Sequence, residues 1–353
     1  MLLSACAPQA ATDGELVSSS TPRAPTADFE VSATRGSAPL TVHFTDTSAA
    51  EPTSWRWDFD NDGFVDSTQR NPTWTFPSNF TYSVALIATN AHGSGSIVRN
   101  DLVFVSPQPN PQLNMVPIEP GVFMIGSAAD PYYVEQPVHQ VTLTAPFWMG
   151  KYEVTQAQYQ AVMGSNPSYF QGASAPNAPQ RPVETVSWNS AFAYCQALTA
   201  TEQAAGRVPA VYQYRLPTEA EWEYCCRAGT TTEWNTGTSL STSQANFQGA
   251  LANGTYTSGQ TAVVGSYAPN AFGLHDMHGN VFEWCLDSYA TYAPGPVTDP
   301  FVTGGAVRVI RGGSWFSLFS ASFCRSAFRG SSAPGIADYV FGFRVVLAPV
   351  LVP

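Results

Sequence analysis

The feature that most constrains this chain is a long irregular segment near the C-terminus, held between two short apolar runs. R-V-I-R-G-G-S-W begins at Arg308, and G-F-R-V-V ends at Val346. Alternating apolar residues predict a strand at each end, and the paired glycines predict a tight turn after the first. The contents from Phe316 to Phe323 follow neither the helical nor the strand period. We therefore expect a presented surface whose ends are fixed by the fold.

Composition narrows what that surface can bind. Of the 353 residues, 26 are acidic and 15 basic, and the formal net charge is −11. Lys151 is the only lysine. Nucleic acid and anionic membranes are recognised by clustered Lys and Arg, so the sequence argues against both as partners. The apolar fraction of 44% is enough for a sizeable core, and the length allows two or three domains.

The first residues predict an exported, lipid-anchored protein. Residues 1–6 end in L-S-A-C, which resembles a bacterial lipobox with Cys6 as the lipidated residue. Five preceding residues are too few for a signal peptide, so we expect the natural start further upstream. Residues 7–26 are expected to be a flexible tether. A chance cysteine is the alternative. No apolar run reaches eighteen residues, so the expected attachment to the bacterial cell envelope is through lipid only.

Residues 27–106 predict an all-β sandwich. Short alternating runs are separated there by Gly, Pro and Asn turn signals. W-R-W-D-F-D from Trp55, P-T-W-T-F from Pro72 and Y-S-V-A-L from Tyr82 resemble a PKD domain. The resemblance implies an immunoglobulin-like sandwich that serves as a spacer or adhesion module. Residues 107–113 are spaced by proline and are expected to be a semi-rigid linker.

One acidic turn in this first domain has the spacing of a calcium loop. Asp58, Asp60 and Asp62 precede Gly63 in a D-x-D-x-D-G pattern, and Asp66 follows. No bidentate glutamate completes an EF-hand. The alternative is that these aspartates form the turn by bonding to their own backbone.

Residues 114–350 predict a mixed α/β domain with few helices and many loops. Thr155 with Gln158, and Thr218 with Glu221, are capping boxes that start helices. Ser187 precedes a third helical apolar face. The cysteines form no C-x-x-C pair and the five histidines are scattered, which argues against zinc, haem and iron–sulfur sites.

Motifs across this second domain resemble, in order, those of the formylglycine-generating enzyme (sulfatase-modifying factor) family. They are F-W-M-G-K-Y-E-V-T from Phe147, R-P-V-E-T-V-S-W from Arg181, R-L-P-T-E-A-E-W-E-Y from Arg215, G-N-V-F-E-W from Gly279, and R-G-G-S-W from Arg311 with G-F-R from Gly342. The resemblance implies the C-type-lectin-like fold of that family.

The charged and aromatic residues of these motifs are expected to hold the loops together. No nucleophile–His–Asp arrangement is evident. Tryptophans 148, 188, 222, 284 and 315 are expected in the core, with their indole N–H groups bonded to backbone. The expected ion pairs join arginines 215, 311 and 344 to glutamates 153, 184, 221 or 283.

The resemblance also implies a structural calcium ion at the G-N-x-x-E-W turn. The matching ligands here are the side chains of Asp276 and Glu283 and the backbone carbonyls of Gly279 and Val281. Two carboxylates and two carbonyls suit a cation that prefers oxygen ligands.

The oxidase activity of the family requires two cysteines after G-G-S, which hold copper(I) as thiolates. The matching positions are Ser317 and either Ala321 or Ser322. A hydroxyl does not replace a thiolate, so we expect no copper and no formylglycine-generating activity. Cys324 is the only cysteine in the segment, and Cys226 is its expected partner if a disulfide forms. An active oxidase of this family is the alternative.

The C-terminal segment also resembles variable proteins of diversity-generating retroelements, which use the same lectin-like fold. Adenine-directed rewriting of Asn codons yields small, apolar and aromatic residues but not Lys, Glu, Gln, Met or Trp. Residues 316–323, 330–333 and 335–341 obey this restriction. The predicted ligand-binding residues are Phe316, Ser317, Leu318, Phe319, Ser320, Ala321, Ser322, Phe323, Gly335, Ile336, Asp338, Tyr339 and Val340. The expected ligand is an extracellular protein or glycan. A non-diversified accessory protein of the same family is the alternative.

Overall fold

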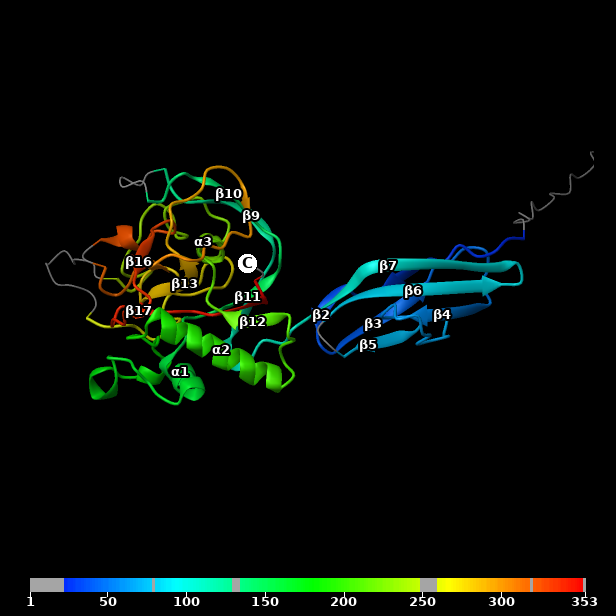
Figure 1. The fold of residues 1–353 in the computed structure, drawn as a ribbon, viewed down its shortest axis with the longest axis horizontal. Coiled ribbons are helices and arrows are strands. Elements are labelled where there is room, and N and C mark those ends of the chain that lie inside the picture. The colour runs from blue at the N-terminus through cyan, green and yellow to red at the C-terminus, as the bar shows by residue number, and fades with distance from the viewer. Residues whose placement is uncertain (1–21, 78–79, 129–133, 248–258, 318–319, 352–353) are drawn as a thin grey trace, which may run out of the picture. The chain divides into compact units, whose positions relative to one another are not determined.

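The chain divides into two compact units. The computed structural model describes residues 22–77, 80–128, 134–247, 259–317 and 320–351. The units are Met1–Ser106 and Pro107–Pro353 (Figure 1). Within the part of the chain that is described, no helix has the length and apolar character needed to cross a membrane. Cys6 and most of the predicted tether lie outside the described residues.

The first unit is the predicted two-sheet sandwich. One sheet has the strand order β1-β3-β5 and the other β2-β7-β6-β4. The strands are β1 Phe29–Val31, β2 Arg35–Ser37, β3 Leu40–Asp46, β4 Ser54–Asp58, β5 Thr73–Phe76, β6 Thr81–Asn90 and β7 Gly93–Ser106. Side chains along β3 alternate between exposed and buried, so Val42 and Phe44 point between the two sheets.

Aromatic side chains fill the space between these sheets. The ring of Trp57 is fully buried, 5.2 Å from Phe29 and 5.5 Å from Phe44 between centroids. Its indole N–H donates to the Gln69 carbonyl at 2.8 Å, so burial leaves no polar atom of the ring without a partner. The W-R-W motif thus supplies the core of the sandwich.

The second unit combines short sheets with long loops. Its sheets have the orders β14-β10-β9, β12-β18-β11-β8 and β16-β15-β13-β17. The strands are β8 Met115–Ile118, β9 Gly121–Ile125, β10 His139–Leu143, β11 Phe147–Gly150, β12 Tyr212–Arg215, β13 Phe282–Ser288, β14 Val297–Thr298, β15 Arg308–Arg311, β16 Gly330–Ser332, β17 Phe341–Gly342 and β18 Val346–Pro349. The helices are α1 Gln156–Met163, α2 Trp188–Ala204 and α3 Glu219–Arg227, with 3-10 turns at Pro111–Leu113, Gly172–Ser174, Ala178–Gln180 and Ala321–Cys324.

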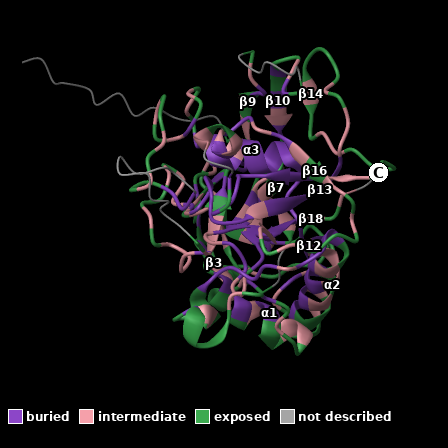
Figure 2. Cartoon of the chain, turned by 90° about the vertical axis from the view of Figure 1, so that its left-hand side faces the viewer, coloured by how far each residue is buried: buried purple, intermediate pink, exposed green. Residues whose placement is uncertain are grey.

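Both predicted capping boxes are formed. Thr155 caps α1 through the N–H of Gln158, and Gly164 in the left-handed region ends the helix. Thr218 caps α3 in the same way through Glu221. Helix α3 is buried almost throughout, whereas α1 and α2 also carry exposed residues (Figure 2). The predicted third helix is α2, with Ser187 as its N-cap.

The irregular C-terminal segment is anchored in two different sheets. Strand β15 pairs with β13 and β16, whereas β18 pairs with β11 and β12. The single closing strand predicted at residues 343–346 is wrong in detail, because β17 ends at Gly342 and β18 begins at Val346. Between them Arg344 turns its side chain inward and is completely buried.

The proline-spaced stretch between the units is not free along its whole length. The Asn110 side chain donates to Glu202 at 2.9 Å, and its backbone N–H donates to the Tyr214 hydroxyl at 2.8 Å. Leu113 is buried. The C-terminal end of the predicted linker therefore belongs to the second unit.

Buried ion pairs join the loops of the second unit. Arg344 binds Glu283 with two bonds of 2.7 Å, and the indole N–H of Trp222 donates to the same carboxylate at 2.8 Å. Arg215 binds Glu221, also with two bonds of 2.7 Å. Both pairs fall within the predicted sets of arginines and glutamates. The prediction that Trp222 donates to backbone was wrong, because its partner is a side chain.

The partner predicted for Arg311 was wrong. Arg311 binds Glu223 and lies 3.6 Å from a carboxylate oxygen of Glu219, and its guanidinium is fully buried. Neither Glu153 nor Glu184 forms one of the arginine salt bridges of the described residues. Helical periodicity could have shown that Glu219 and Glu223 lie one turn apart and face the same side of α3.

We expect Arg311→Met to destabilise the second unit by about 3–5 kcal/mol, because it leaves buried carboxylates without their cation. Equilibrium urea unfolding measures this. Arg99→Met, in the first unit, is the control: Arg99 and its partner Asp28 are both partly exposed, so this change should cost the first unit less than about 1 kcal/mol. Equal costs for the two variants would contradict the structural role of the buried pairs.

Candidate functional site

A turn of fixed conformation starts the presented segment. Gly312 and Gly313 both have positive φ, at 90° and 76°. A Cβ on Gly313 would overlap the Cys324 sulfur, so the turn requires glycine there. The Ser314 N–H then donates to the Ser317 hydroxyl at 2.8 Å, and the Trp315 N–H donates to the Asn280 carbonyl at 2.8 Å.

Trp315 and four other aromatic side chains pack together, and we call these five the aromatic platform. They are Tyr169, Phe170, Trp315, Phe316 and Tyr339. Trp315 is buried, and its ring centroid lies 5.3 Å from those of Phe170 and Phe316 and 5.7 Å from that of Tyr339. Its indole N–H donates to the Tyr339 carbonyl at 3.2 Å. The buried indole therefore fixes rings from three separate loops.

The second half of the segment is fixed through its backbone. The Thr185 N–H donates to the Asp338 carbonyl at 2.9 Å, and the Asn189 N–H donates to the Pro334 carbonyl at 3.1 Å. These bonds dock residues 334–338 on the start of α2. The side chains of Ile336 and Tyr339 remain 51% and 41% exposed. A fixed backbone with exposed side chains is the arrangement expected of a recognition surface.

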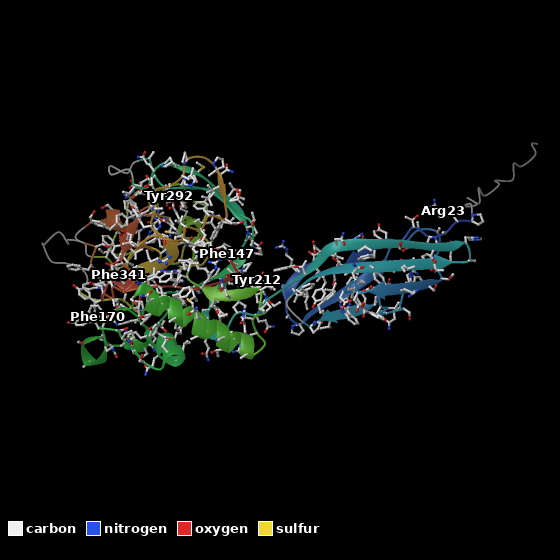
Figure 3. The ribbon with its side chains drawn as sticks, viewed as in Figure 1. Arg23, Phe147, Phe170, Tyr212, Tyr292 and Phe341 are labelled. Carbon is white, nitrogen blue, oxygen red and sulfur yellow. The ribbon has the colours of Figure 1, made fainter. Side chains whose placement is uncertain are left out.

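The loop between α1 and α2 adds two rings that the sequence analysis missed. The buried Glu184 carboxylate accepts the N–H of Tyr169 at 3.0 Å and that of Phe170 at 2.9 Å. Burial raises the pKa of Glu184, while these bonds act in the opposite direction. Tyr169 is 72% exposed. Figure 3 labels Phe170 near Phe341 of β17, at the same end of the second unit in that view.

An adjacent aromatic pair in a loop rich in Ser, Pro and Gly was the available signal for this loop. Nothing in the sequence shows, however, that the loop lies beside the C-terminal segment.

The predicted ligand-binding residues do not form one exposed face. Phe316, Ser322, Gly335, Ile336 and Tyr339 are exposed. Half-buried positions are Ser320, Ala321, Phe323, Asp338 and Val340, and Ser317 is buried. Leu318 and Phe319 lie outside the described residues. The prediction was wrong for Ser317, because its hydroxyl closes the turn at Ser314 and has no room to face outward.

The half-buried residues of this segment pack inward. Phe323 lies 5.1 Å from Phe328 between ring centroids. Ala321 packs against a small core that contains Phe247 and Cys324, and its carbonyl accepts the indole N–H of Trp234 at 3.3 Å. The 3-10 turn Ala321–Cys324 thus closes onto the core through Ala321 and Cys324, which lie three residues apart and so on the same side of the turn.

The residues at the copper positions do not fit copper(I). Ser317 offers a buried hydroxyl that already accepts the Ser314 N–H. The thiol of Cys324 lies 3.7 Å from that hydroxyl, and burial raises the pKa of this thiol to about 12. Copper(I) needs thiolates, and a single protonated thiol does not supply them.

The disulfide considered between Cys226 and Cys324 is not formed, and all five described cysteines are free and buried. The Cys226 sulfur contacts the Met277 carbonyl at 3.7 Å and His278 Nδ1 at 3.9 Å. His278 in turn bonds to the Cys324 carbonyl through Nδ1 and accepts the Asn235 N–H through Nε2. Burial lowers the pKa of His278 to about 4, so the ring is neutral.

Three buried acids, which we call the carboxylate cluster, surround the predicted calcium turn: Glu153, Asp276 and Glu283. One oxygen of Asp276 accepts the Gly265 N–H at 2.7 Å, and the other is buried without a partner. Burial raises the pKa of Asp276 to about 6. Burial, with the nearby charges of Asp276 and Glu283, raises that of Glu153 well above its usual range.

The carboxylate cluster has one cationic neighbour. Arg344 binds Glu283 directly and acts on the other two acids through its charge. When all three acids are ionised, the single guanidinium leaves a net charge of −2, which a divalent cation would balance. The unpartnered Asp276 oxygen and this charge fit a calcium ion. The carboxylate oxygens of the three side chains do not all lie within 4.8 Å of one another, whereas those of Asp58, Asp60 and Asp66 in the first unit do.

Glu153 is a cluster member that the sequence analysis assigned to an arginine. Its carboxylate accepts the Asn280 side-chain N–H at 2.7 Å and the Val281 N–H at 3.2 Å. It therefore holds the same turn whose Gly279 and Val281 carbonyls were predicted as ligands.

The acidic turn of the first unit has features of both predicted arrangements, a calcium loop and a turn held by aspartates that bond to their own backbone. Oxygen atoms of Asp58, Asp60 and Asp66 lie within 4.8 Å of one another. Asp62 is not in this group, because its carboxylate caps the N–H of Phe64. The Asp58 carboxylate is also occupied, since it accepts two backbone N–H groups of the turn. Bonding of aspartate to its own backbone therefore explains much of the pattern.

Comparison with protein families matches both units. Residues 102–349 match the family model of the sulfatase-modifying factor enzyme 1-like domain, and residues 19–105 match that of the PKD domain. The chain is 41% identical over 182 residues to a formylglycine-generating enzyme of Streptomyces coelicolor, covering 47% of this chain and 52% of that one. It is 33% identical over 265 residues to serine/threonine-protein kinase pkn1 of Chlamydia pneumoniae, covering 67% and 38%. The chain thus spans 52% and 38% of the length of these two relatives.

Two solved structures share the fold of the second unit. Treponema denticola variable protein 1 superposes with a TM-score of 0.57 at 31% identity, covering 67% of this chain and 95% of that chain. PvdO from Pseudomonas aeruginosa superposes with a TM-score of 0.54 at 29% identity, covering 66% and 94%. The scaffold is therefore shared with a protein named for its variability.

We expect Glu184→Gln to loosen the Tyr169 loop without unfolding the unit, because an amide nitrogen cannot accept one of the two backbone N–H groups. An unpaired buried N–H costs about 1–3 kcal/mol, so amide hydrogen exchange at Tyr169 and Phe170 should become about 10- to 100-fold faster. Exchange in α3, which does not bond to Glu184, is the internal control. Unchanged exchange at both amides would contradict the clamp.

Proposed function

Because the chain belongs to the family of the sulfatase-modifying factor enzyme 1-like domain, with a PKD domain before it, we propose that it uses this scaffold to bind a ligand and not to catalyse an oxidation. The binding face is the exposed part of the C-terminal segment. Its ligand-contacting residues are Phe316, Ser322, Gly335, Ile336 and Tyr339. The ligand is extracellular, and a retroelement diversifies the segment.

One observation carries this proposal: the segment combines a buried framework with exposed, replaceable side chains. Gly313, Ser314 and Trp315 are fixed by sterics and hydrogen bonds, whereas Ile336 and Tyr339 leave large parts of their surface to solvent. Exposed aromatic and aliphatic side chains on a fixed backbone are typical binding anchors. The similarity to Treponema denticola variable protein 1 supports the same proposal.

The absence of catalysis is tested directly. We expect the purified chain, loaded with copper(I), to produce no formylglycine from a sulfatase-type cysteine peptide, because Ser317 and Ser322 provide no thiolates. Mass spectrometry of the peptide measures the product. A formylglycine-generating enzyme assayed in parallel is the positive control. Product above the level of a reaction without protein would favour the oxidase alternative.

Diversification is tested in the genome. The proposal expects a near-copy of the DNA encoding residues 312–344, rich in adenine at the codons of the exposed positions, beside a reverse-transcriptase gene. Absence of both would favour a non-diversified accessory protein that binds through the same face. Binding itself is tested with a peptide library and a glycan array, since Tyr339→Ala and Ile336→Ser should each reduce capture of any ligand found.

We also propose that the carboxylate cluster holds a structural calcium ion, with Asp276, Glu153 and Glu283 supplying side-chain oxygens and Gly279 and Val281 supplying carbonyls. The ion would neutralise buried charge and fix the turn that supports Trp315 through Asn280. The unpartnered oxygen of Asp276 supports this assignment.

We expect millimolar calcium to raise the melting temperature of the wild-type chain by several degrees relative to EDTA, because a ligand that binds only the folded state stabilises it. Asp276→Asn should lose most of this shift. Asp60→Asn, in the acidic turn of the first unit, is the matched control and should keep it. A shift that disappears in Asp60→Asn and persists in Asp276→Asn would assign calcium to the first unit.

The location of the protein is a further part of the proposal. We propose attachment to the bacterial cell envelope through a lipid on Cys6, with the residues before the PKD domain as a tether. Metabolic labelling with palmitate in the native host tests this, and Cys6→Ala should abolish the label. Incorporation of label into Cys6→Ala would remove the lipid anchor from the proposal.

A further inference from the structure

The most exposed ring of the aromatic platform does not belong to the C-terminal segment. Tyr169 is 72% exposed and comes from the loop between α1 and α2. Its ring centroid lies 6.0 Å from that of Tyr339, with a tilt of 43° between the planes. The two rings present neighbouring faces, one from a loop clamped by Glu184 and one from the segment that carries the proposed binding face.

The surroundings of this ring pair are uncharged or acidic. An open depression of about 650 Å³ beside the loop is lined by Tyr169, Phe170, Ser174, Gly259 and Gln260, none of which is charged. Asp338 precedes Tyr339 directly and is only half-buried. Among the described residues, the ionisable side chains named here besides the tyrosines are therefore acids: Asp338 and the buried Glu184 under the Tyr169 loop.

The arginines of the second unit are occupied elsewhere. Residues 107–353 contain nine arginines and one lysine against fifteen acidic residues. Seven of the nine arginines pair with a glutamate: they are Arg207, Arg215, Arg227, Arg311, Arg325, Arg329 and Arg344. The other two donate to backbone carbonyls, Arg181 to Pro176 and Arg308 to Leu286. The second unit thus uses its arginines internally.

We propose that the ligand is a polypeptide that places a lysine or arginine side chain over the Tyr169–Tyr339 pair, with Tyr169 as a constant anchor beside the variable residues. This rests on the proposed binding function. Aromatic faces attract cations, and Asp338 adds a complementary charge. A neutral glycan would not use that charge, and an anionic ligand would meet no lysine or arginine among the residues that line the depression beside the pair.

Equilibrium binding to labelled Gly-Ser peptides tests this inference. Three peptides of equal length carry three spaced lysines, norleucines or glutamates. We expect the lysine peptide to bind most tightly to the full chain and to weaken with added salt. Tyr169→Ala should weaken its binding about two- to fivefold, and Tyr169→Phe should largely preserve it, because phenylalanine keeps the aromatic face.

Phe64→Ala is the matched control, since Phe64 is an equally exposed ring (76%) in the first unit; this variant should bind like wild type. Equal binding of the norleucine and lysine peptides would overturn the inference. The inference would also be overturned if the lysine peptide did not bind, or if Tyr169→Ala bound it with unchanged affinity. Loss of binding to a neutral glycan in Tyr169→Ala would overturn it as well.

These failures are distinct from failure of the binding face itself. A ligand whose capture depends on Tyr339 and Ile336 but not on Tyr169 or on a basic side chain would retain the proposed function and remove only this inference.

Discussion

The second unit depends on buried pairs of glutamate and arginine, above all Glu283 with Arg344. Besides its two bonds to Glu283, the Arg344 guanidinium donates to the carbonyls of Gly150 and His275, each at 3.0 Å. One side chain thus joins β11, β13 and a loop. The desolvation of two charges is unfavourable unless every donor and acceptor is used. Here that requirement fixes the relative positions of segments that have little regular secondary structure.

The presented segment inherits its rigidity from this network. Strand β15 ends at Arg311, which is held by Glu223 of α3, and the segment re-enters the core at Phe343, which contacts Tyr194 of α2. Between these points the backbone is fastened by Trp315 and by the bonds from Thr185 and Asn189. Replacement of an exposed side chain there removes none of these contacts. That independence is the physical condition for a face that tolerates variation.

Local signals in the sequence predicted local structure well. The capping boxes at Thr155 and Thr218 each need only residues within one turn, and both are formed. The glycine pair likewise predicted its turn. Motif resemblance gave the fold, and the charges of the motifs indicated ion pairs, of which Arg215–Glu221 and Arg344–Glu283 are formed. Contacts between distant loops were not predictable in this way, because neither periodicity nor spacing reports them.

Tyr169 and Glu153 illustrate that limit. Their partners, Tyr339 and Asn280, are more than a hundred residues away in the sequence, and only the folded backbone brings them together. Ser317 illustrates the converse. Serine is one of the residues that adenine-directed rewriting yields, so Ser317 was predicted to contact the ligand. Its hydroxyl instead accepts a backbone N–H of its own turn.

The burial of Ser317 restricts how such a segment can vary. If adenine-directed rewriting acted at this codon, it would introduce bulky residues such as Phe or Tyr where the hydroxyl now closes a turn over Cys324. Overpacking a site that is 3% exposed would displace Ser314 and the Trp315 ring above it. Phe316 and Ile336 face solvent and carry no such cost. The composition of the segment alone therefore predicts more variable positions than the fold allows. Burial separates the residues that rewriting permits into those that support the fold and those that can contact a ligand.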